Sequence, residues 1–317
     1  MKDITLESFE TDVLQASVAT PVLIDFWATW CGPCRTLGPI LEKLETDYKG
    51  RFTLAKIDSD AERELSQAFG VRSIPTVILM KNGQPVDGFV GALPEGQIRT
   101  FLDKHVPAEN ELVSEEEQDE AGALLAEGNR DGALEKLSEA LAVDPSNDAA
   151  RADYVRLLAE SGRADDARRA LEPVADRIDG HTPDQRYVAL DHYVRAHEAV
   201  ASLRPESELQ AVLAANPRDF DAALALAQHR WVQGEPAAAM DALLEIVKRD
   251  RNWQEGLARR TYVAILEVLS NRAKAAAPHA AEAAPAGKLI TSSGAPQTAP
   301  QDPLIAEYRR KLSMALF

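Results

Sequence analysis

Two cysteines with two residues between them, at the junction of a buried strand and a helix, constrain the fold of this chain more than any other feature. The apolar run Val22–Trp27 follows Pro21 and is typical of a strand buried on both faces. Beyond Cys31 and Cys34, apolar residues recur at helical spacing between positions 37 and 48. A buried strand that passes into a helix within a few residues is the basic unit of an α/β domain.

The rest of the first hundred residues continues this alternation of strands and helices. The predicted elements are, in order, a strand, a helix, two strands and a helix, at residues 52–57, 61–69, 76–80, 86–90 and 93–105. Asn82-Gly83, between the last two strands, is a strong hairpin signal, so those strands should be antiparallel. The sequence therefore predicts an α/β domain over residues 1–107, with a mixed sheet and flanking helices.

The position of the cysteine pair favours thiol–disulfide exchange. A helix N-terminus carries unpaired N–H groups and a partial positive charge, which stabilise a thiolate. Cys31 should occupy that end, and Cys34 should lie one turn inside, within reach of a mixed disulfide on Cys31. A bare Cys-x-x-Cys could also be half of a zinc site, but the chain has no other cysteine and its six histidines lie elsewhere. We therefore expect no bound metal.

Charge and hydropathy narrow the setting in which this dithiol acts. The chain does not begin with a signal peptide, and no run of about 18 apolar residues could span a membrane. We therefore expect a cytoplasmic protein without membrane contact, and in a reducing compartment a close cysteine pair is more often catalytic than structural. The formal charge of −16, without a basic stripe, argues against binding to nucleic acid.

The stretch VLIDFWATWCGPC, residues 22–34, resembles thioredoxin almost residue for residue. Further matches follow in order at Lys56, at Ile74-Pro75-Thr76 and at Val90-Gly91. The resemblance covers about residues 1–105. It implies a thioredoxin fold whose reactive group is the Cys31–Cys34 disulfide, with no other cofactor.

The same resemblance implies roles for individual residues. Cys31 is the attacking thiolate, and Cys34 resolves the mixed disulfide. Asp25 is the proton acceptor for Cys34, with Lys56 beside it. Pro75 is the expected cis-proline, whose neighbouring backbone pairs with an extended client segment. The implied client-binding surface consists of Trp30, Gly32, Pro33, Ile74, Pro75, Thr76 and Gly91.

Beyond residue 107 the chain contains a degenerate helical repeat. An acidic linker or helix start is predicted at 108–120, and no strand signal follows it. The frame Gly128, Ala133 and Leu137 recurs 34 residues later and again further on, as Gly162, Ala167, Leu171, Gly234, Ala239 and Leu243. This frame resembles tetratricopeptide repeats over residues 113–270, with one longer helix pair at 182–215 and a final helix at 254–270. Stacked pairs leave a concave groove that usually binds proteins, although a plain helical spacer remains the alternative.

The C-terminal part consists of two different segments. Residues 271–301, rich in Ala and Pro, cannot bury enough surface to fold alone and should form a disordered linker. Residues 302–317 should form an amphipathic helix that Asp302 caps. Such a helix either docks back on the repeats or enters the groove of a partner, and the sequence leaves both open. The residues predicted to bind a partner are Leu304, Tyr308, Leu312 and Leu316 on one face, Arg309 and Arg310 on the other, and the terminal Phe317.

The order of these parts resembles the bacterial chaperedoxins, in which a thioredoxin domain precedes degenerate tetratricopeptide repeats and a terminal helix. The resemblance implies a redox co-chaperone that holds unfolded or oxidised client proteins, protects their cysteines through mixed disulfides and delivers them to the chaperonin. The terminal helix would contact the chaperonin, and a thioredoxin-type reductase system would be a further partner. Two alternatives stay open: a dedicated protein-disulfide reductase whose repeats select one substrate, and an assembly scaffold with a vestigial dithiol.

Overall fold

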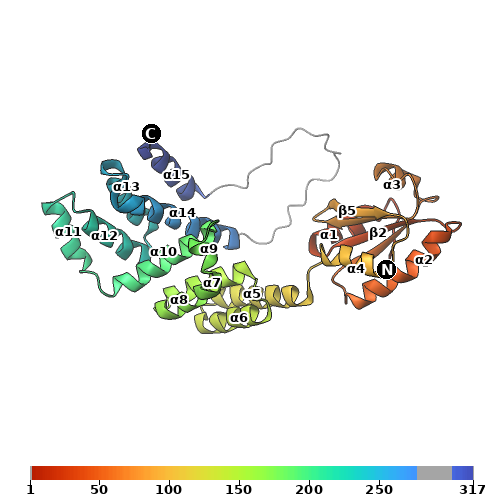
Figure 1. Ribbon diagram of the computed structural model, residues 1–317, viewed down its shortest axis with the longest axis horizontal. Helices are drawn as coiled ribbons and strands as arrows, with labels where there is room; N and C mark the ends of the chain where they lie inside the picture. The colour runs from red at the N-terminus through yellow and green to blue at the C-terminus, as the bar shows by residue number, and fades with distance from the viewer. Residues whose placement is uncertain (1, 277–301, 317) are drawn as a thin grey trace. The chain divides into compact units, whose positions relative to one another are not determined.

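The computed structural model describes residues 2–276 and 302–316 and divides the chain into two compact units (Figure 1). The first unit ends at Leu112, and the second begins at Val113. Within the described ranges, no helix combines the length and the apolar character that a bilayer crossing requires.

The first unit is built on a five-stranded mixed sheet with the order β1-β3-β2-β4-β5. The strands are β1 (Lys2–Asp3), β2 (Val22–Trp27), β3 (Thr53–Asp58), β4 (Thr76–Lys81) and β5 (Gln84–Val90). β2 pairs in parallel with β3 and antiparallel with β4, and β4 pairs antiparallel with β5, which confirms the predicted hairpin and mixed sheet. The helical elements are η1 (Glu10–Gln15), α1 (Ala16–Ala19), α2 (Gly32–Asp47), α3 (Arg63–Ala68) and α4 (Glu95–Asp103).

Helices cover both faces of this sheet, which explains why five of the six residues of β2 are apolar. Because side chains alternate along a strand, Leu23 packs with α2 and α4 through Leu41 and Ile98. Its neighbour Ile24 points to the opposite face and packs with Val13 of η1 and Leu65 of α3. The core therefore lies on both sides of β2, and the loop after this strand is held rigidly at one end of the sheet.

The second unit is all-helical and follows the predicted repeat frame (Figure 1). Its main helices are α5 (Glu109–Ala126), α6 (Arg130–Val143), α7 (Asp148–Glu160), α8 (Ala164–Leu171), α10 (Gln185–Val200), α11 (Glu206–Ala215), α12 (Phe220–Val232), α13 (Pro236–Arg249), α14 (Leu257–Ala276) and α15 (Pro303–Leu316). Short turns of helix complete it at η2 (Glu172–Val174), α9 (Asp176–Asp179) and η3 (Trp253–Gly256). The repeat glycines all lie in turns between paired helices with positive φ, and the repeat alanines are fully buried where the helices cross.

Two boundaries in this unit differ from the simplest form of the prediction, which gives residues 108–120 as a linker or a helix start. The expected acidic linker at 108–120 is helical from Glu109 on, because α5 buries Ser114 and Ala121 on one side and pairs its acidic residues with Lys136 on another. The last repeat helix, α14, continues to Ala276, six residues beyond its predicted end. The remainder of the predicted linker, residues 277–301, lies outside the described residues.

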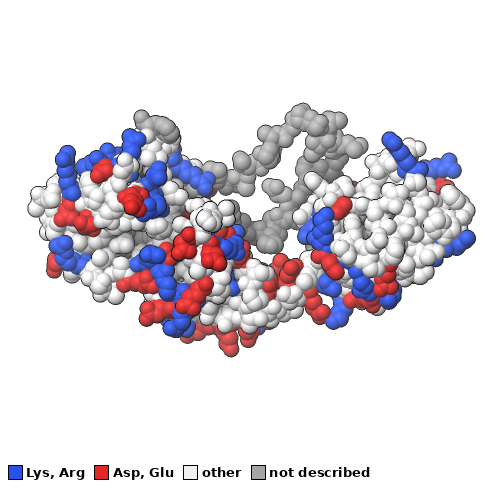
Figure 2. Space-filling view, in the orientation of Figure 1, with Lys and Arg blue, Asp and Glu red and all other residues white. Residues whose placement is uncertain are grey.

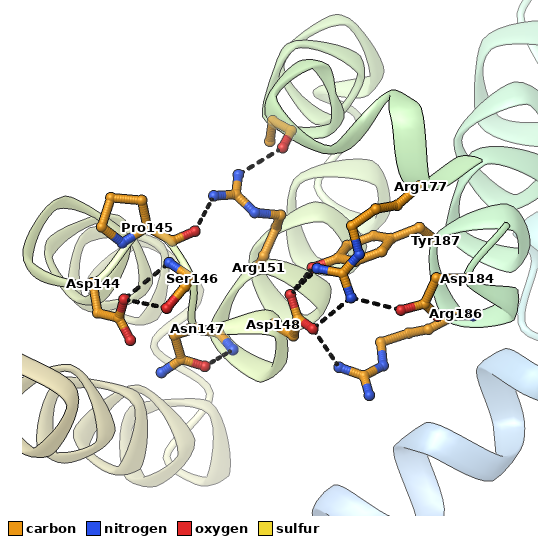
Figure 3. Close-up of polar contacts among 12 residues, drawn as sticks. Asp144, Pro145, Ser146, Asn147, Asp148, Arg151, Arg177, Asp184, Arg186 and Tyr187 are labelled. Atoms are coloured by element: carbon orange, nitrogen blue, oxygen red, sulfur yellow. Dashed lines mark hydrogen bonds and ion pairs between the residues drawn. The ribbon is translucent and has the colours of Figure 1, made fainter. Parts of the chain in front are cut away.

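A polar network fastens the longer repeat to its predecessor (Figure 3). Asp148, at the start of α7, accepts hydrogen bonds from Arg177 of α9 at 2.7 Å and from the hydroxyl of Tyr187 in α10 at 2.6 Å. Arg177 also donates to Asp184 at 2.6 Å, and its guanidinium lies over the Tyr187 ring. The extra residues of η2 and α9 are thereby tied to both neighbouring helices.

Arg151 completes this junction from within α7 (Figure 3). Its side chain is buried and donates to the backbone carbonyl oxygens of Ala170 at 3.0 Å and Pro145 at 2.8 Å. These carbonyls stand at the ends of α8 and of the turn after α6. Arg151 therefore satisfies acceptors that two helices leave unpaired, and it joins three consecutive segments of the chain.

The terminal helix α15 docks on the repeats of its own chain, which answers the question that the sequence left open. It packs against α13 and α14, with Ile305, Tyr308 and Leu312 buried in the core of the second unit. The predicted partner face is therefore largely covered in this conformation. Arg309 and Arg310 stay exposed, and Phe317 lies outside the described residues.

Candidate active site

The cysteine pair lies where β2 gives way to α2, as predicted. Cys31 is the N-cap of α2, and its sulfur accepts a hydrogen bond from the backbone N–H of Cys34 at 3.2 Å. Pro33 occupies the first turn, where its missing N–H has no intrahelical partner to lose. The two cysteines form a disulfide and are largely buried. Together these contacts place the reactive sulfurs at the positive end of a helix dipole.

Asp25 is a buried carboxyl in the strand that leads to the cysteines. It is 1% exposed, and its Oδ1 has no hydrogen-bond partner among the described residues. Burial raises the pKa of Asp25 to about 6, against the opposing effect of the Lys56 ammonium. A carboxyl with this pKa can accept a proton near neutral pH and release it again, which suits the predicted role.

Lys56 lies next to Asp25 in the sheet, because Asp25 of β2 and Lys56 of β3 are register partners. Its ammonium pairs with Glu42 of α2 at 3.2 Å and lies 5.1 Å from the centre of the Trp27 ring. The pairing with Glu42 adds a second carboxylate, which further raises the pKa of Asp25. The sequence motif did not reveal Glu42, since only the folded helix brings it to this lysine.

The predicted client-binding residues surround the disulfide. The bond between Ile74 and Pro75 is cis, which confirms that prediction, and Ile74 packs against the two cysteines. The N–H of Gly91 donates to the carbonyl of Pro75 at 2.8 Å, so the loop after β5 is held beside the cis bond. Thr76 begins β4 and is buried, with its hydroxyl donating to the carbonyl of Ser73 at 2.6 Å.

Trp30 provides the exposed apolar part of this surface. Its side chain is 67% exposed, and its indole N–H donates to Asp60 at 2.7 Å. This hydrogen bond holds the indole ring of the residue that directly precedes Cys31. Val90 is 63% exposed next to Gly91 and is a further apolar residue that the predicted site omitted. Val90 ends an edge strand and directly precedes Gly91, and this position in the sequence could have identified it as part of the site.

The described residues do not form a side-chain cluster of the kind that binds metal ions. Among residues 2–276 and 302–316, no three His, Cys, Asp or Glu side chains cluster in a way that could hold a metal ion. The disulfide at the N-terminus of α2 and the raised pKa of the Asp25 carboxyl support thiol–disulfide chemistry at this site.

The residues predicted to bind a partner lie in the second unit and are anchored there. The Tyr308 hydroxyl donates to Asp241 of α13 at 3.0 Å, and the Tyr262 hydroxyl of α14 donates to the Tyr308 carbonyl at 2.7 Å. Arg309 donates to the Ser270 hydroxyl at 3.2 Å. Arg310 has no ion-pair partner among the described residues, so it is the freest of the predicted partner residues.

Comparison with known proteins assigns both units. Residues 1–104 match the thioredoxin family model, and residues 124–190 and 200–279 match tetratricopeptide repeat models. The thioredoxin of Chlorobaculum thiosulfatiphilum is 44% identical over 102 residues, which cover 32% of this chain and 93% of that protein. The thioredoxin of Haemophilus influenzae is 43% identical over 98 residues, covering 31% of this chain and 90% of that protein. The chloroplastic M-type thioredoxin of Zea mays is 40% identical over 95 residues, or 30% of this chain and 57% of that protein.

Proposed function

The chain belongs to the thioredoxin family through its N-terminal domain, and from this premise we propose that it is a redox co-chaperone. The thioredoxin domain supplies a thiol–disulfide oxidoreductase whose reactive group is the Cys31–Cys34 pair. The repeats hold unfolded or oxidised client proteins, and the terminal helix delivers them to the chaperonin. The observation that carries the proposal is the presence of a redox-active disulfide and of tetratricopeptide repeats in one chain.

The exchange reaction proceeds through one mixed disulfide. The Cys31 thiolate attacks one sulfur of a client disulfide, so that a bond between Cys31 and the client forms and the other client sulfur leaves as a thiolate. Asp25 then accepts the proton of Cys34. The Cys34 thiolate attacks Cys31, which forms the Cys31–Cys34 disulfide and releases the first client sulfur as a thiolate. The client gains two electrons, and a thioredoxin-type reductase system in the cytoplasm returns two electrons to the chain.

Trapping the mixed disulfide tests the breadth of clients. In Cys34→Ser the resolving thiol is missing, so client adducts on Cys31 should accumulate in cells and can be identified by mass spectrometry. Many unrelated adducts are expected for a co-chaperone. One dominant adduct would instead favour a dedicated reductase whose repeats select a single substrate. The double variant Cys31→Ser with Cys34→Ser is the matched control and should form none.

Holding and exchange should be separable. Cys31→Ser removes the attacking sulfur but leaves the helical unit intact, so it should still suppress aggregation of an unfolding client while it forms no adducts. Equal loss of both activities would contradict a division of labour between the units. Failure of the wild-type chain to reduce insulin disulfides would favour the scaffold with a vestigial dithiol.

The proposed contact with the chaperonin needs a test that leaves α15 docked on the repeats. Deleting residues 302–317 would uncover the apolar surface that α15 protects, so loss of binding could have another cause. Reversing the exposed charge that has no hydrogen-bond or ion-pair partner among the described repeats, as Arg310→Glu, avoids this problem. We expect co-purification with chaperonin to be lost and insulin reduction to stay unchanged. Retained co-purification would refute the assignment of α15 as the contact element.

A further inference from the structure

An open groove lies on the second unit beside the docked terminal helix. It is lined from α10, α14 and α15 and holds about 360 Å³. Ala189 of α10 and Ala264 of α14 form a closely packed apolar base, since both are almost fully buried. Val263 of α14 lines the groove as well and is 40% exposed. We call this feature the tail groove.

The terminal helix builds one wall of the tail groove. Leu312 and Leu316 of α15 line it directly opposite residues that belong to the repeats. Leu312 is buried, and Leu316 keeps part of its surface accessible. The groove is therefore a composite site, because it loses this wall whenever α15 leaves the repeats.

The rim of the tail groove carries charges that the chain itself does not neutralise. Arg259 and Arg260 are exposed on the rim, and neither has an ion-pair partner within residues 2–276 and 302–316. Glu267 lies seven residues further along the same helix, about 10 Å from Arg260, and has no cationic partner in the described ranges either. The groove thus has a positive end and a negative end, with apolar side chains between them.

The positive end stands out against the acidic chain around it. Residues 248–276 contain seven Lys and Arg against three Asp and Glu, although the whole chain carries −16. In Figure 2 basic side chains gather at the upper edge of the second unit, where α13, α14 and α15 lie, whereas acidic side chains are prominent along the lower edge around α5 and α6, with basic ones between them. An acidic ligand would be attracted to one end of this unit and repelled from the other.

From this arrangement we propose that the tail groove binds a short peptide segment of another protein. The segment carries an acidic side chain for Arg259 and Arg260, apolar side chains over Val263, and a basic side chain for Glu267. Nucleic acid fits less well, because its backbone offers no apolar side chains and Glu267 repels phosphate. This binding deepens the proposed function, which has the repeats hold client proteins, and it rests on that function. It requires neither the dithiol nor the chaperonin, so it can fail while thiol–disulfide exchange and chaperonin binding both hold.

A consequence of the composite wall is that ligand and tail stabilise each other. A peptide that contacts Leu312 and Leu316 binds only the docked state of α15, so it must favour docking. The effect is reciprocal, since any change that releases α15 must weaken the peptide. The groove therefore couples occupancy by a peptide to the availability of the terminal helix.

The first experiment measures affinity with the full-length chain. The probe is a fluorescein-labelled synthetic peptide with two glutamates at one end, two leucines in the middle and a lysine at the other end. We expect saturable binding that weakens with salt, and Arg259→Glu with Arg260→Glu should weaken it at least about tenfold. Arg218→Glu, which reverses one exposed unpaired arginine outside the groove, is the control for a charge reversal elsewhere on the unit and should leave the affinity unchanged.

Three results of this experiment would overturn the proposal. They are the absence of saturable binding to the wild type, equal loss in Arg218→Glu, and tighter binding of a single-stranded oligonucleotide that the two-arginine reversal abolishes. Val263→Ser offers an independent check, because it removes apolar surface from the groove without placing a charge beside either arginine. Peptide affinity that Val263→Ser leaves unchanged would also contradict the proposed site.

The second experiment tests the coupling by hydrogen exchange of α15. At a peptide concentration about nine times its Kd, exchange of the α15 amides should slow about tenfold, because the peptide binds only the docked state. Amides of β2 in the first unit should not change and serve as the internal control. Unchanged α15 exchange at saturating peptide would refute the composite wall.

Discussion

At the scale of single residues, the buried carboxyl of Asp25 makes the stability of the protein depend on pH. Its pKa is raised from 3.8 to about 6, chiefly by burial. Below about pH 4 the carboxyl is neutral in both folded and unfolded chains and costs nothing. Between about pH 4 and 6 only the unfolded chain ionises, so stability falls as the pH rises. Above about pH 6 the full penalty of about 3 kcal/mol remains.

Asp25→Asn should therefore stabilise the oxidised protein only above about pH 4, where the unfolded chain ionises Asp25. We expect a gain in the free energy of unfolding of up to about 3 kcal/mol near pH 7, and almost none below about pH 4. Guanidinium unfolding of both proteins across this pH range measures the difference. A gain that is independent of pH would show that the carboxyl is not the cause. The same variant should resolve mixed disulfides more slowly if Asp25 is the proton acceptor for Cys34, as the proposed function requires.

The two charged neighbours of Asp25 should shift its titration in opposite directions. Lys56→Met removes a cation that favours the carboxylate, so the pKa of Asp25 should rise further. Glu42→Gln removes a like charge and should lower that pKa. The pH dependence of insulin reduction by each variant reports both changes. Shifts in the same direction would mean that the substitutions act by distorting the site.

The reactive residues could be predicted from the sequence, whereas their supporting partners could not. Cys31, Cys34 and Pro75 lie in short contiguous motifs, and such motifs survive in the linear chain. Glu42 reaches Lys56 and Asp60 reaches Trp30 only after helix, strand and loop have packed together. Contacts of this kind depend on tertiary placement, which local residue patterns do not encode.

At the scale of elements, the repeat turns depend on backbone conformation more than on space. Gly162 has a φ of 75°, and no atom lies within 4 Å of the position that a Cβ would take. Gly162→Ala should therefore cost about 1–2 kcal/mol through backbone strain alone. Gly122→Ala, in the middle of α5 with equally open space, should instead stabilise the helix by about 0.5–1 kcal/mol.

This pair of identical substitutions separates strain from side-chain size. Thermal unfolding of the full chain, followed by the helical signal, should move in opposite directions for the two variants. Destabilisation by both would mean that the added methyl group itself disturbs the packing.

The sequence predicts the helices well where small residues recur at the points where paired helices cross. It predicts them less well in segments that consist mainly of charged residues. The acidic run before Ala121 resembles a linker because its hydrophobic residues are few. In the folded unit Lys136 of α6 pairs with Glu117 and Glu120 of α5, and α5 buries Ser114 and Ala121. The end of α14 was set too early for a related reason. Ala273 and its neighbours lack large apolar side chains, but alanine is also the strongest helix former.

At the scale of the whole molecule, one helix serves two competing partners. The apolar face of α15 packs on α13 and α14, while the proposed function gives the same helix to the chaperonin. A partner that needs the apolar face must therefore displace α15 from the repeats. Its apparent affinity is then reduced by the fraction of molecules in which the helix is undocked. A substitution that weakens the docking of α15 on the repeats without altering α15 itself should therefore raise the affinity for the chaperonin.

Tyr262→Phe provides that change. The Tyr262 hydroxyl donates to the Tyr308 carbonyl at 2.7 Å, and its loss should weaken docking by about 1 kcal/mol. If docking limits capture, affinity for purified chaperonin should rise about fivefold in biolayer interferometry. Tyr154→Phe removes a hydroxyl from α7 that makes no hydrogen bond with the described residues, so it is the matched control and should change nothing. Unchanged or weaker binding by Tyr262→Phe would mean that the chaperonin contacts α15 in its docked position, through the exposed arginines.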